Sequence, residues 1–230
     1  MIYCQHRKRL SNGLKHWLLT TEMDKNNLIN MVRSKCEKMI NILVLISVGL
    51  FLFLMIGRTI MLTKRGIKVW VISGSSKNMA KRILEILFIP GFLTFFILVA
   101  ATAANIFSLP FLWQASKSDI AGITLCYIGL AIFFCALVSF GESWRIGVDE
   151  KNSDKLIQKG VFAISRNPIF LFMDMYFLGM ALVYPTILFI VICVAFFIGI
   201  HMQILSEEAF LKKKFGEEYA LYCKKVRRYL

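Results

Sequence analysis

Long apolar runs alternate with polar, mostly basic segments along this chain. Four of the five runs are close to, or somewhat shorter than, the ~20 residues that a helix needs to cross the hydrocarbon of a bilayer, and the second is longer. Helices are expected because unpaired backbone groups are costly in lipid. The runs are Ile40–Ile56, Ile83–Phe111, Ile120–Phe140, Pro168–Val183 and Thr186–Ile200. The pattern predicts an all-α, multi-pass transmembrane bundle of about five spans, with one domain at 39–230 after a basic N-terminal segment at 1–38.

Breaks in the pattern refine this picture. Pro90-Gly91 interrupts the second run, and Tyr184-Pro185 joins the last two runs into a tight hairpin. Gly216 is expected to break the helix that continues beyond the fifth run. The helix after it carries Tyr219 and Tyr222 and ends in basic residues, which is typical of an amphipathic tail lying on anionic lipid.

Composition supports a membrane protein. Hydrophobic residues make up 57% of the 230 positions, and the formal net charge is +14. A basic surface can indicate nucleic-acid binding. Here, however, the basic residues flank apolar runs, where they match anionic lipid head groups. We therefore expect the lipid bilayer as a partner and no nucleic acid.

The distribution of Lys and Arg predicts an orientation. The first loop, the third loop and the C-terminal tail carry seven, five and seven of them, whereas the N-terminal segment and the second loop carry eight and one. The positive-inside rule places the first group in the cytoplasm. The basic N-terminal segment argues the other way, unless it lies on the surface or the first run does not cross fully. We expect a cytoplasmic active face, in a bacterial inner membrane or the endoplasmic reticulum.

The step Arg166-Asn167-Pro168 is the first candidate for chemistry. Proline suits the first helical turn, and Asn167 is a natural N-cap before it. The free N–H groups of a helix start form a potential anion site, and Arg166 beside them can pair with a carboxylate or phosphate. Alternatively, Asn167-Pro168 only starts a helix, and Arg166 extends to a lipid head group.

A carboxylate pair, Glu207 and Glu208, follows the fifth run. Glu208 is expected to pair with Lys212 at i,i+4, which leaves Glu207 as the better candidate for a ligand. The alternative is a solvated carboxylate pair. Arg145, after the interface anchor Trp144, can hold a substrate head group or a lipid phosphate. The Cys and His residues are too scattered to predict a metal site.

At these residues the chain resembles the isoprenylcysteine carboxyl methyltransferases, integral membrane enzymes with phospholipid N-methyltransferase relatives. The resemblance covers about Leu156–Tyr229 and keeps the order and spacing of the family's motifs. These motifs stand here as Gly160-Val161-Phe162, Arg166-Asn167-Pro168-Ile169-Phe170, Glu207-Glu208-Ala209-Phe210-Leu211 and Phe215-Gly216-Glu217-Glu218-Tyr219-Ala220-Leu221-Tyr222.

The resemblance implies S-adenosylmethionine as methyl donor, in a pocket within 154–230 that the tail covers. Arg166 and Arg145 are our candidate catalytic residues. The resemblance also implies a substrate contact at Gln203, where family members have an arginine. The implied donor contacts are Lys155, Leu156, Ile157, Phe162, Asn167, Pro168, Ile169, Phe170 and Glu207.

Three departures from the family pattern concern the acceptor more than the donor. Asn167 replaces a histidine, Phe162 and Phe170 replace tyrosines, and Gln203 replaces the arginine. The leading hypothesis is a membrane S-adenosylmethionine-dependent methyltransferase acting on a lipid-like or small amphipathic acceptor. The alternatives are an NADPH-dependent membrane reductase of the sterol type and a non-catalytic subunit with the same fold.

Overall fold

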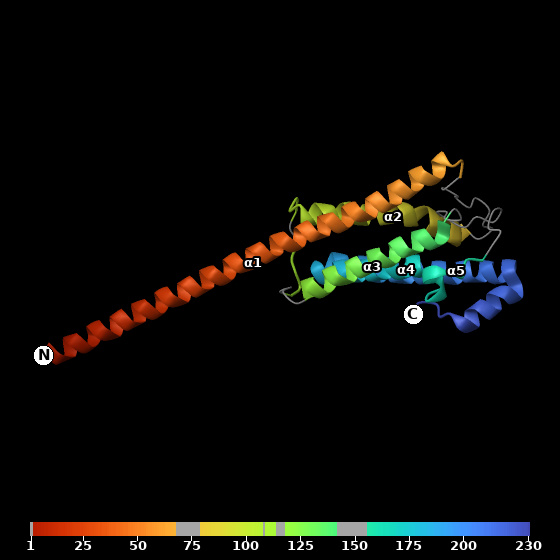
Figure 1. Cartoon of the computed structure of the whole chain (residues 1–230). Coiled ribbons are helices and arrows are strands. Elements are labelled where there is room, and N and C mark those ends of the chain that lie inside the picture. The colour runs from red at the N-terminus through yellow and green to blue at the C-terminus, as the bar shows by residue number, and fades with distance from the viewer. Residues whose placement is uncertain (1, 68–78, 108, 114–117, 142–155) are drawn as a thin grey trace. The chain divides into compact units, whose positions relative to one another are not determined.

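The described part of the protein is helical and lacks strands. The computed structural model describes residues 2–67, 79–107, 109–113, 118–141 and 156–230. It has a short 3₁₀ helix, η2 (Gly160–Ala163), and five α-helices (Figure 1). The α-helices are α1 (Ile2–Lys64), α2 (Met79–Ala103), α3 (Ser118–Phe140), α4 (Pro168–Val183) and α5 (Ile187–Lys225). The predicted all-α fold class is therefore confirmed.

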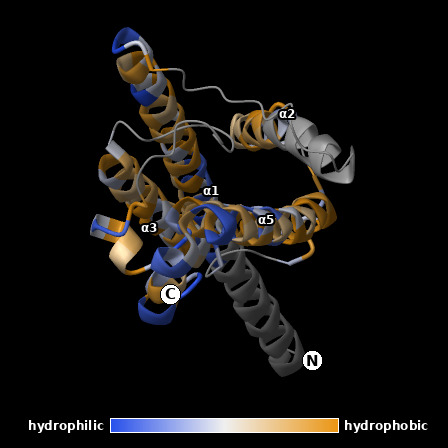
Figure 2. Ribbon diagram, turned by 90° about the vertical axis from the view of Figure 1, so that its right-hand side faces the viewer, coloured by the Kyte–Doolittle hydropathy of each residue, from blue (hydrophilic) through white to orange (hydrophobic). Residues whose placement is uncertain are grey.

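Several helices have the length and composition of membrane spans. Asn27–Lys64 of α1, α3 and α5 are long and apolar enough to cross a membrane, and Pro90–Ala103 and α4 are shorter apolar helices. Many large apolar side chains on these helices are exposed, as expected of surfaces that face lipid. Figure 2 shows hydrophobic residues along the helices and hydrophilic ones around the C-terminal tail. The number of spans, expected to be about five, remains a prediction.

Helix α1 extends beyond the predicted first span in both directions. The chain divides into two compact units, Met1–Ile42 and Leu43–Leu230, and the boundary falls within this helix. In the first unit, Arg33 and Glu37 form an exposed i,i+4 ion pair of 3.1 Å. Such a pair adds only a few tenths of a kcal/mol to a helix. The second unit contains the candidate site.

Helix α2 departs from the sequence expectation at two points. Pro90 lies inside the helix instead of interrupting it, as membrane helices tolerate proline better than soluble ones. The helix also ends at Ala103, short of the predicted Phe111. Asn105 there has φ 55°, and the Ile106 N–H bonds back to the Ala101 carbonyl. This left-handed cap ends the helix although apolar residues continue beyond it.

An aromatic cluster joins the helices of the second unit. Phe51 of α1 stacks on Phe96 of α2 with ring centroids 4.3 Å apart, and it also contacts Phe133 of α3 and Phe172 of α4. Phe177 of α4 stacks on Phe196 of α5 at 4.1 Å. Such pairs add about 0.5–1.5 kcal/mol beyond the burial of their area. The cluster thus brings all five helices to one core.

Helices α3 and α4 approach each other closely through glycines. A Cβ built on Gly122 would lie 2.5 Å from the carbonyl oxygen of Gly179, and one on Gly179 would lie 2.7 Å from the carbonyl oxygen of Gly122. Small residues of this kind let membrane helices pack backbone against backbone. At the far end of α4, Thr186 caps α5 by accepting a bond from the Phe189 N–H. The predicted hairpin of α4 and α5 is therefore confirmed.

The close packing of α3 and α4 generates a stability prediction. Gly179→Ala should lower the free energy of unfolding by about 1–3 kcal/mol, because the new methyl group forces the helices apart. The matched control is Gly199→Ala, where the added methyl has no atom within 4 Å. That control should be neutral or stabilise by about 0.5–1 kcal/mol. Unfolding in detergent micelles measures both, and equal effects would show that the glycines do not set the helix separation.

Candidate functional site

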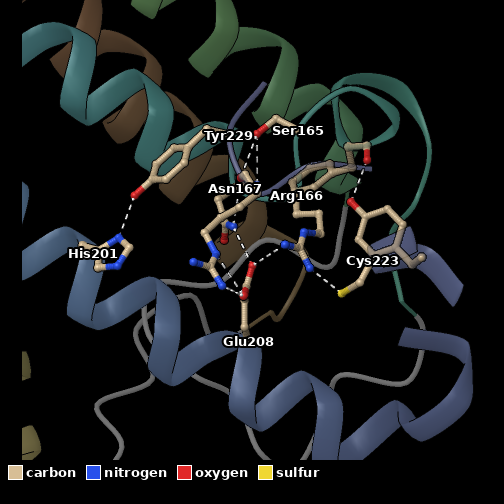
Figure 3. A network of polar contacts seen from close by, with 10 residues as sticks. Ser165, Arg166, Asn167, His201, Glu208, Cys223 and Tyr229 are labelled. Carbon is tan, nitrogen blue, oxygen red and sulfur yellow. Dashed lines mark hydrogen bonds and ion pairs between the residues drawn. The ribbon is translucent and has the colours of Figure 1, made fainter. Parts of the chain in front are cut away.

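A polar cluster forms where the start of α4, the middle of α5 and the C-terminal tail meet (Figure 3). Glu208 of α5 lies at its centre. Its Oε1 lies 3.3 Å from Nη2 of Arg166, and its Oε2 lies 2.8 Å from Nη2 of Arg228. The side chains of Arg166 and Glu208 are only 13% and 12% exposed, whereas that of Arg228 is 35% exposed. The expected pairing of Glu208 with Lys212 is wrong, because both carboxylate oxygens face the two arginines instead.

Asn167 occupies the predicted N-cap position of α4 but does not cap the helix with its side chain. The amide Nδ2 instead donates to Oε1 of Glu208 at 3.4 Å and to the carbonyl oxygen of Arg228 at 3.2 Å. Asn167 is buried, and its own N–H donates to Oγ of Ser165 at 3.2 Å. The side chain thus connects the start of α4 to the tail.

The backbone of the tail returns over the start of α4. The Arg166 N–H donates to the carbonyl oxygen of Arg227 at 3.0 Å, and Ser165 and Arg227 form an isolated parallel bridge. Ser165 Oγ lies 3.4 Å from the carbonyl oxygen of Arg228, to which it donates. The predicted folding of the tail over the Pro168 helix start is therefore confirmed.

A single glycine makes this return possible. Gly216 has φ 53° and ψ −118° within α5, a backbone conformation that residues other than glycine rarely adopt. The kink divides α5 into a membrane arm before Gly216 and a tail arm after it. Gln158 Nε2 donates to Glu218 on the tail arm at 2.9 Å, which fixes the tail arm to the segment before η2.

The tyrosines of the tail arm point into the protein. Tyr219 and Tyr222 are buried together with Val226, and Leu156 packs against them. The Tyr222 hydroxyl donates to the carbonyl oxygen of Phe162 at 2.6 Å. The sequence predicted an amphipathic tail lying on lipid, and contact of the tail with lipid stays a prediction. The kink at Gly216 turns the face that carries the two tyrosines onto η2.

The electrostatics of the cluster leave an excess of positive charge. Two guanidinium groups, from Arg166 and Arg228, surround one carboxylate. The hydrogen bond to Glu208 holds the pKa of the Arg228 guanidinium above its usual value. Arg166 also contacts Sγ of Cys223, while its buried Nε has no partner among the described residues. An arginine beside a helix start suits a carboxylate or phosphate ligand.

The residues predicted to contact the donor fall into three groups. Phe162, Asn167 and Pro168 are buried, and the Phe162 ring meets that of Phe140 edge-on at 4.7 Å. Glu207 accepts a bond from Nε2 of Gln203 at 3.1 Å, so these two predicted residues lie together. Leu156, Ile157, Ile169 and Phe170 are half-buried. The predicted residues Arg145 and Lys155 lie outside the described residues.

A cavity between the two arms of α5 adjoins the cluster. Its volume is about 390 Å³, and Glu208 and Tyr219 form part of its wall. The buried hydroxyl of Tyr219 has no hydrogen-bond partner among the described residues. The other lining residues are Leu205, Ala209, Lys212, Ala220 and Cys223. The sequence analysis missed this cavity, together with the roles of Arg228 and Cys223. The only signal was Gly216, since the cavity exists only if the chain reverses there.

Removing the central carboxylate should loosen the tail. Glu208→Ala leaves two arginines without their counter-charge, and breaking a buried ion pair in this way costs about 3 kcal/mol or more. We expect a lower unfolding midpoint and faster tryptic cleavage after Lys224, Lys225 and Arg227. Glu217→Ala, on the exposed side of the tail arm, is the control and should behave as wild type. An unchanged midpoint and cleavage rate for Glu208→Ala would contradict the role of Glu208.

Comparison with protein families places this site in a known context. Residues 118–218, which comprise α3, α4 and α5 as far as Glu218, match the phospholipid methyltransferase family. No curated protein matches the chain. The matched residues include Arg166, Asn167 and Glu208, but not Arg228. The resemblance inferred from the motifs is thus confirmed: across residues 118–218, this chain is similar to the phospholipid methyltransferase family, which is related to the isoprenylcysteine carboxyl methyltransferases.

Proposed function

We propose that this protein is an integral membrane methyltransferase that uses S-adenosylmethionine and acts on a lipid-like or small amphipathic acceptor. One observation carries the proposal. Within the segment that matches the methyltransferase family, the chain folds so that Arg166 and Asn167 contact Glu208, the sequence neighbour of Glu207, beneath the tail. Residues 41 apart in the sequence, Asn167 and Glu208, thus share one polar cluster.

The chemistry of the cluster suits this donor. The excess positive charge and the unpartnered Nε of Arg166 fit an anionic group such as the carboxylate of an amino acid. The half-buried Glu207 fits a cationic group. When bound, the donor supplies an electrophilic methyl group on a sulfonium. Transfer from a sulfonium needs positioning more than acid–base catalysis.

The protein's own residues would bind and orient the donor. Asn167 and Pro168 present the start of α4, and Phe162 and Leu156 supply apolar walls. The tail arm, packed on η2 through Tyr222, excludes water from this region. Arg166 serves as the candidate catalytic residue. Arg145 and Lys155, outside the described residues, remain proposed contacts.

The acceptor would arrive from the bilayer. Apolar side chains are exposed along α5, including Val191, Val194 and Ile198. A lipid-like molecule can therefore reach the protein sideways, while the polar donor enters from the aqueous phase. Gln203, bonded to Glu207 on α5, is the proposed contact where donor and acceptor meet.

A non-catalytic subunit of the same fold is the second candidate. It is favoured by Asn167 and Gln203, which replace a histidine and an arginine of the family pattern. A sterol-type membrane reductase is the third. Calorimetry on the detergent-purified protein separates them: S-adenosylmethionine binds an enzyme of the first kind, NADPH binds a reductase, and neither binds a non-catalytic subunit.

The Glu207 carboxylate gives a sharp test of the donor site. Glu207→Gln should weaken S-adenosylmethionine binding about ten-fold or more, because a charge-assisted hydrogen bond is lost. Its unfolding midpoint should stay near that of wild type, in contrast to Glu208→Ala. Glu217→Gln is the matched control and should bind normally. Failure of folded wild-type protein to bind the donor at millimolar concentration would refute the proposed activity.

Labelling of introduced cysteines tests the proposed cytoplasmic face. The positions are Lys159 before η2, Lys213 on α5, and Leu112, whose N–H bonds to Pro185 at the opposite end of α4. In a background without native cysteines, a membrane-impermeant maleimide should label Leu112→Cys in intact cells. It should label Lys159→Cys and Lys213→Cys only after permeabilisation. Labelling of the last two in intact cells would reverse the orientation.

A further inference from the structure

A second set of polar residues, which we call a layer, lies farther along the α4–α5 hairpin toward its turn than the Glu208 cluster. Asp174 follows Asn167 by seven residues in α4, and His201 precedes Glu208 by seven residues in α5. Seven residues are about two helical turns, or roughly 10 Å. Asp174, which is buried, and His201, which is exposed, are therefore displaced by a similar distance along the hairpin toward its Tyr184-Pro185 turn. We call these two residues and Tyr229 the inner layer.

The tail supplies one residue to each layer. Arg228 pairs with Glu208, and the next residue, Tyr229, places its hydroxyl 3.2 Å from Nδ1 of His201 (Figure 3). Burial, and secondarily the negative charge of Asp174 on α4, raises the pKa of the Tyr229 phenol above its usual value. His201 and Tyr229 thus join α5 to the tail, and Asp174 is the α4 residue at a similar position along the hairpin.

The carboxylates of the two layers differ in their hydrogen-bond and ion-pair partners. Glu208 has two arginines and an amide as partners. Asp174 is only 6% exposed, and its Oδ1 has no hydrogen-bond partner among the residues that the structure describes. No described Lys, Arg or His forms an ion pair with it. A carboxylate in this state costs free energy, and the described part of the fold does not offset that cost.

An unpartnered carboxylate inside a membrane helix indicates a ligand. Such residues are expensive in lipid and mark substrate or ion pathways. A metal ion is a poor match, because the described residues contain no group of three or more His, Cys, Asp and Glu side chains that could hold one. The remaining complement is a group with an N–H or O–H, since a carboxylate accepts hydrogen bonds and repels anions.

We propose that Asp174 binds the N–H or O–H group of an amphiphile that enters from the bilayer, with Tyr229 and His201 forming the rest of its polar site. The proposal rests on the proposed function in one respect, that this amphiphile is the methyl acceptor. The acceptor's polar group then lies below the donor cluster, while its apolar chain remains in lipid. In its ionised form, Asp174 would repel a carboxylate acceptor.

Three amphiphiles of equal chain length test the proposal without any methyl donor. Dodecylamine, 1-dodecanol and dodecanoic acid are titrated into the full-length protein in nonionic detergent, and the unfolding midpoint is followed. Saturable stabilisation is expected from the amine or the alcohol, and none from the acid. Between the first two, stabilisation by the amine alone identifies a cationic group, whereas stabilisation by both identifies a neutral donor. Stabilisation by the acid, or by none of the three, would overturn the proposal.

Asp174→Asn identifies the residue responsible. The apparent affinity for the stabilising amphiphile should fall about ten-fold or more, because a charge-assisted bond is lost. Without amphiphile, the variant should unfold at the same or a higher temperature than wild type, since an unpaired buried carboxylate has been removed. Glu217→Gln is the control. A strongly destabilised Asp174→Asn protein would show a structural role and overturn the proposal, as would an unchanged affinity.

A measurement on the wild-type chain avoids any dependence on variants. Dicyclohexylcarbodiimide, a lipid-soluble reagent, modifies carboxyl groups in membrane helices, and peptide mapping locates the adduct. Modification of Asp174 should be blocked by the stabilising amphiphile and not by dodecanoic acid. Modification that neither amphiphile affects would contradict binding at Asp174. Because donor binding is measured separately, loss of S-adenosylmethionine binding alone would refute the proposed function and leave this site standing.

Discussion

The ion pairs of Glu208 are the constraint on which the rest of the site depends. One carboxylate contacts Arg166 at the start of α4 and Arg228 in the tail, two positions 62 residues apart in the sequence. An aqueous ion pair adds little to stability, but one excluded from water is costly unless every partner is present. The start of α4, the middle of α5 and the tail must therefore come together for any of these charges to be satisfied.

Local signals predicted the parts of the fold that they control. The bounds of α4, Pro168 and Val183, agree with the prediction, because Asn167-Pro168 starts a helix and Tyr184-Pro185 ends it. Hydropathy was a poorer guide to helix ends. Helix α5 continues beyond the apolar run to Lys225, and α2 stops within an apolar run, since backbone hydrogen bonding and the left-handed Asn105 decide where it ends.

The sequence predicted which residues belong to the candidate site better than it predicted which of them contact each other. Motif spacing selected Arg166, Asn167, Glu207 and Glu208, and the structure brings these residues into one region. The sequence could not assign the partner of Glu208, because the i,i+4 rule considers only neighbours on the same helix. Arg228 lies 20 residues away and reaches Glu208 only through the kink at Gly216. Asp174 carried no motif, and only its burial without a partner distinguishes it.

The contact between Gly122 and Gly179 has a consequence for motion. With backbone against backbone, α4 cannot slide or roll along α3 without a clash. The α3–α4 pair therefore behaves as a stationary frame, and the α4 half of the site is fixed to it. The tail arm joins the rest of α5 through one non-helical residue, Gly216. Lifting the tail from the start of α4 would break the Glu208–Arg228 ion pair and the bonds of Ser165, Arg166 and Asn167 to the tail backbone, while the α3–α4 frame stayed in place.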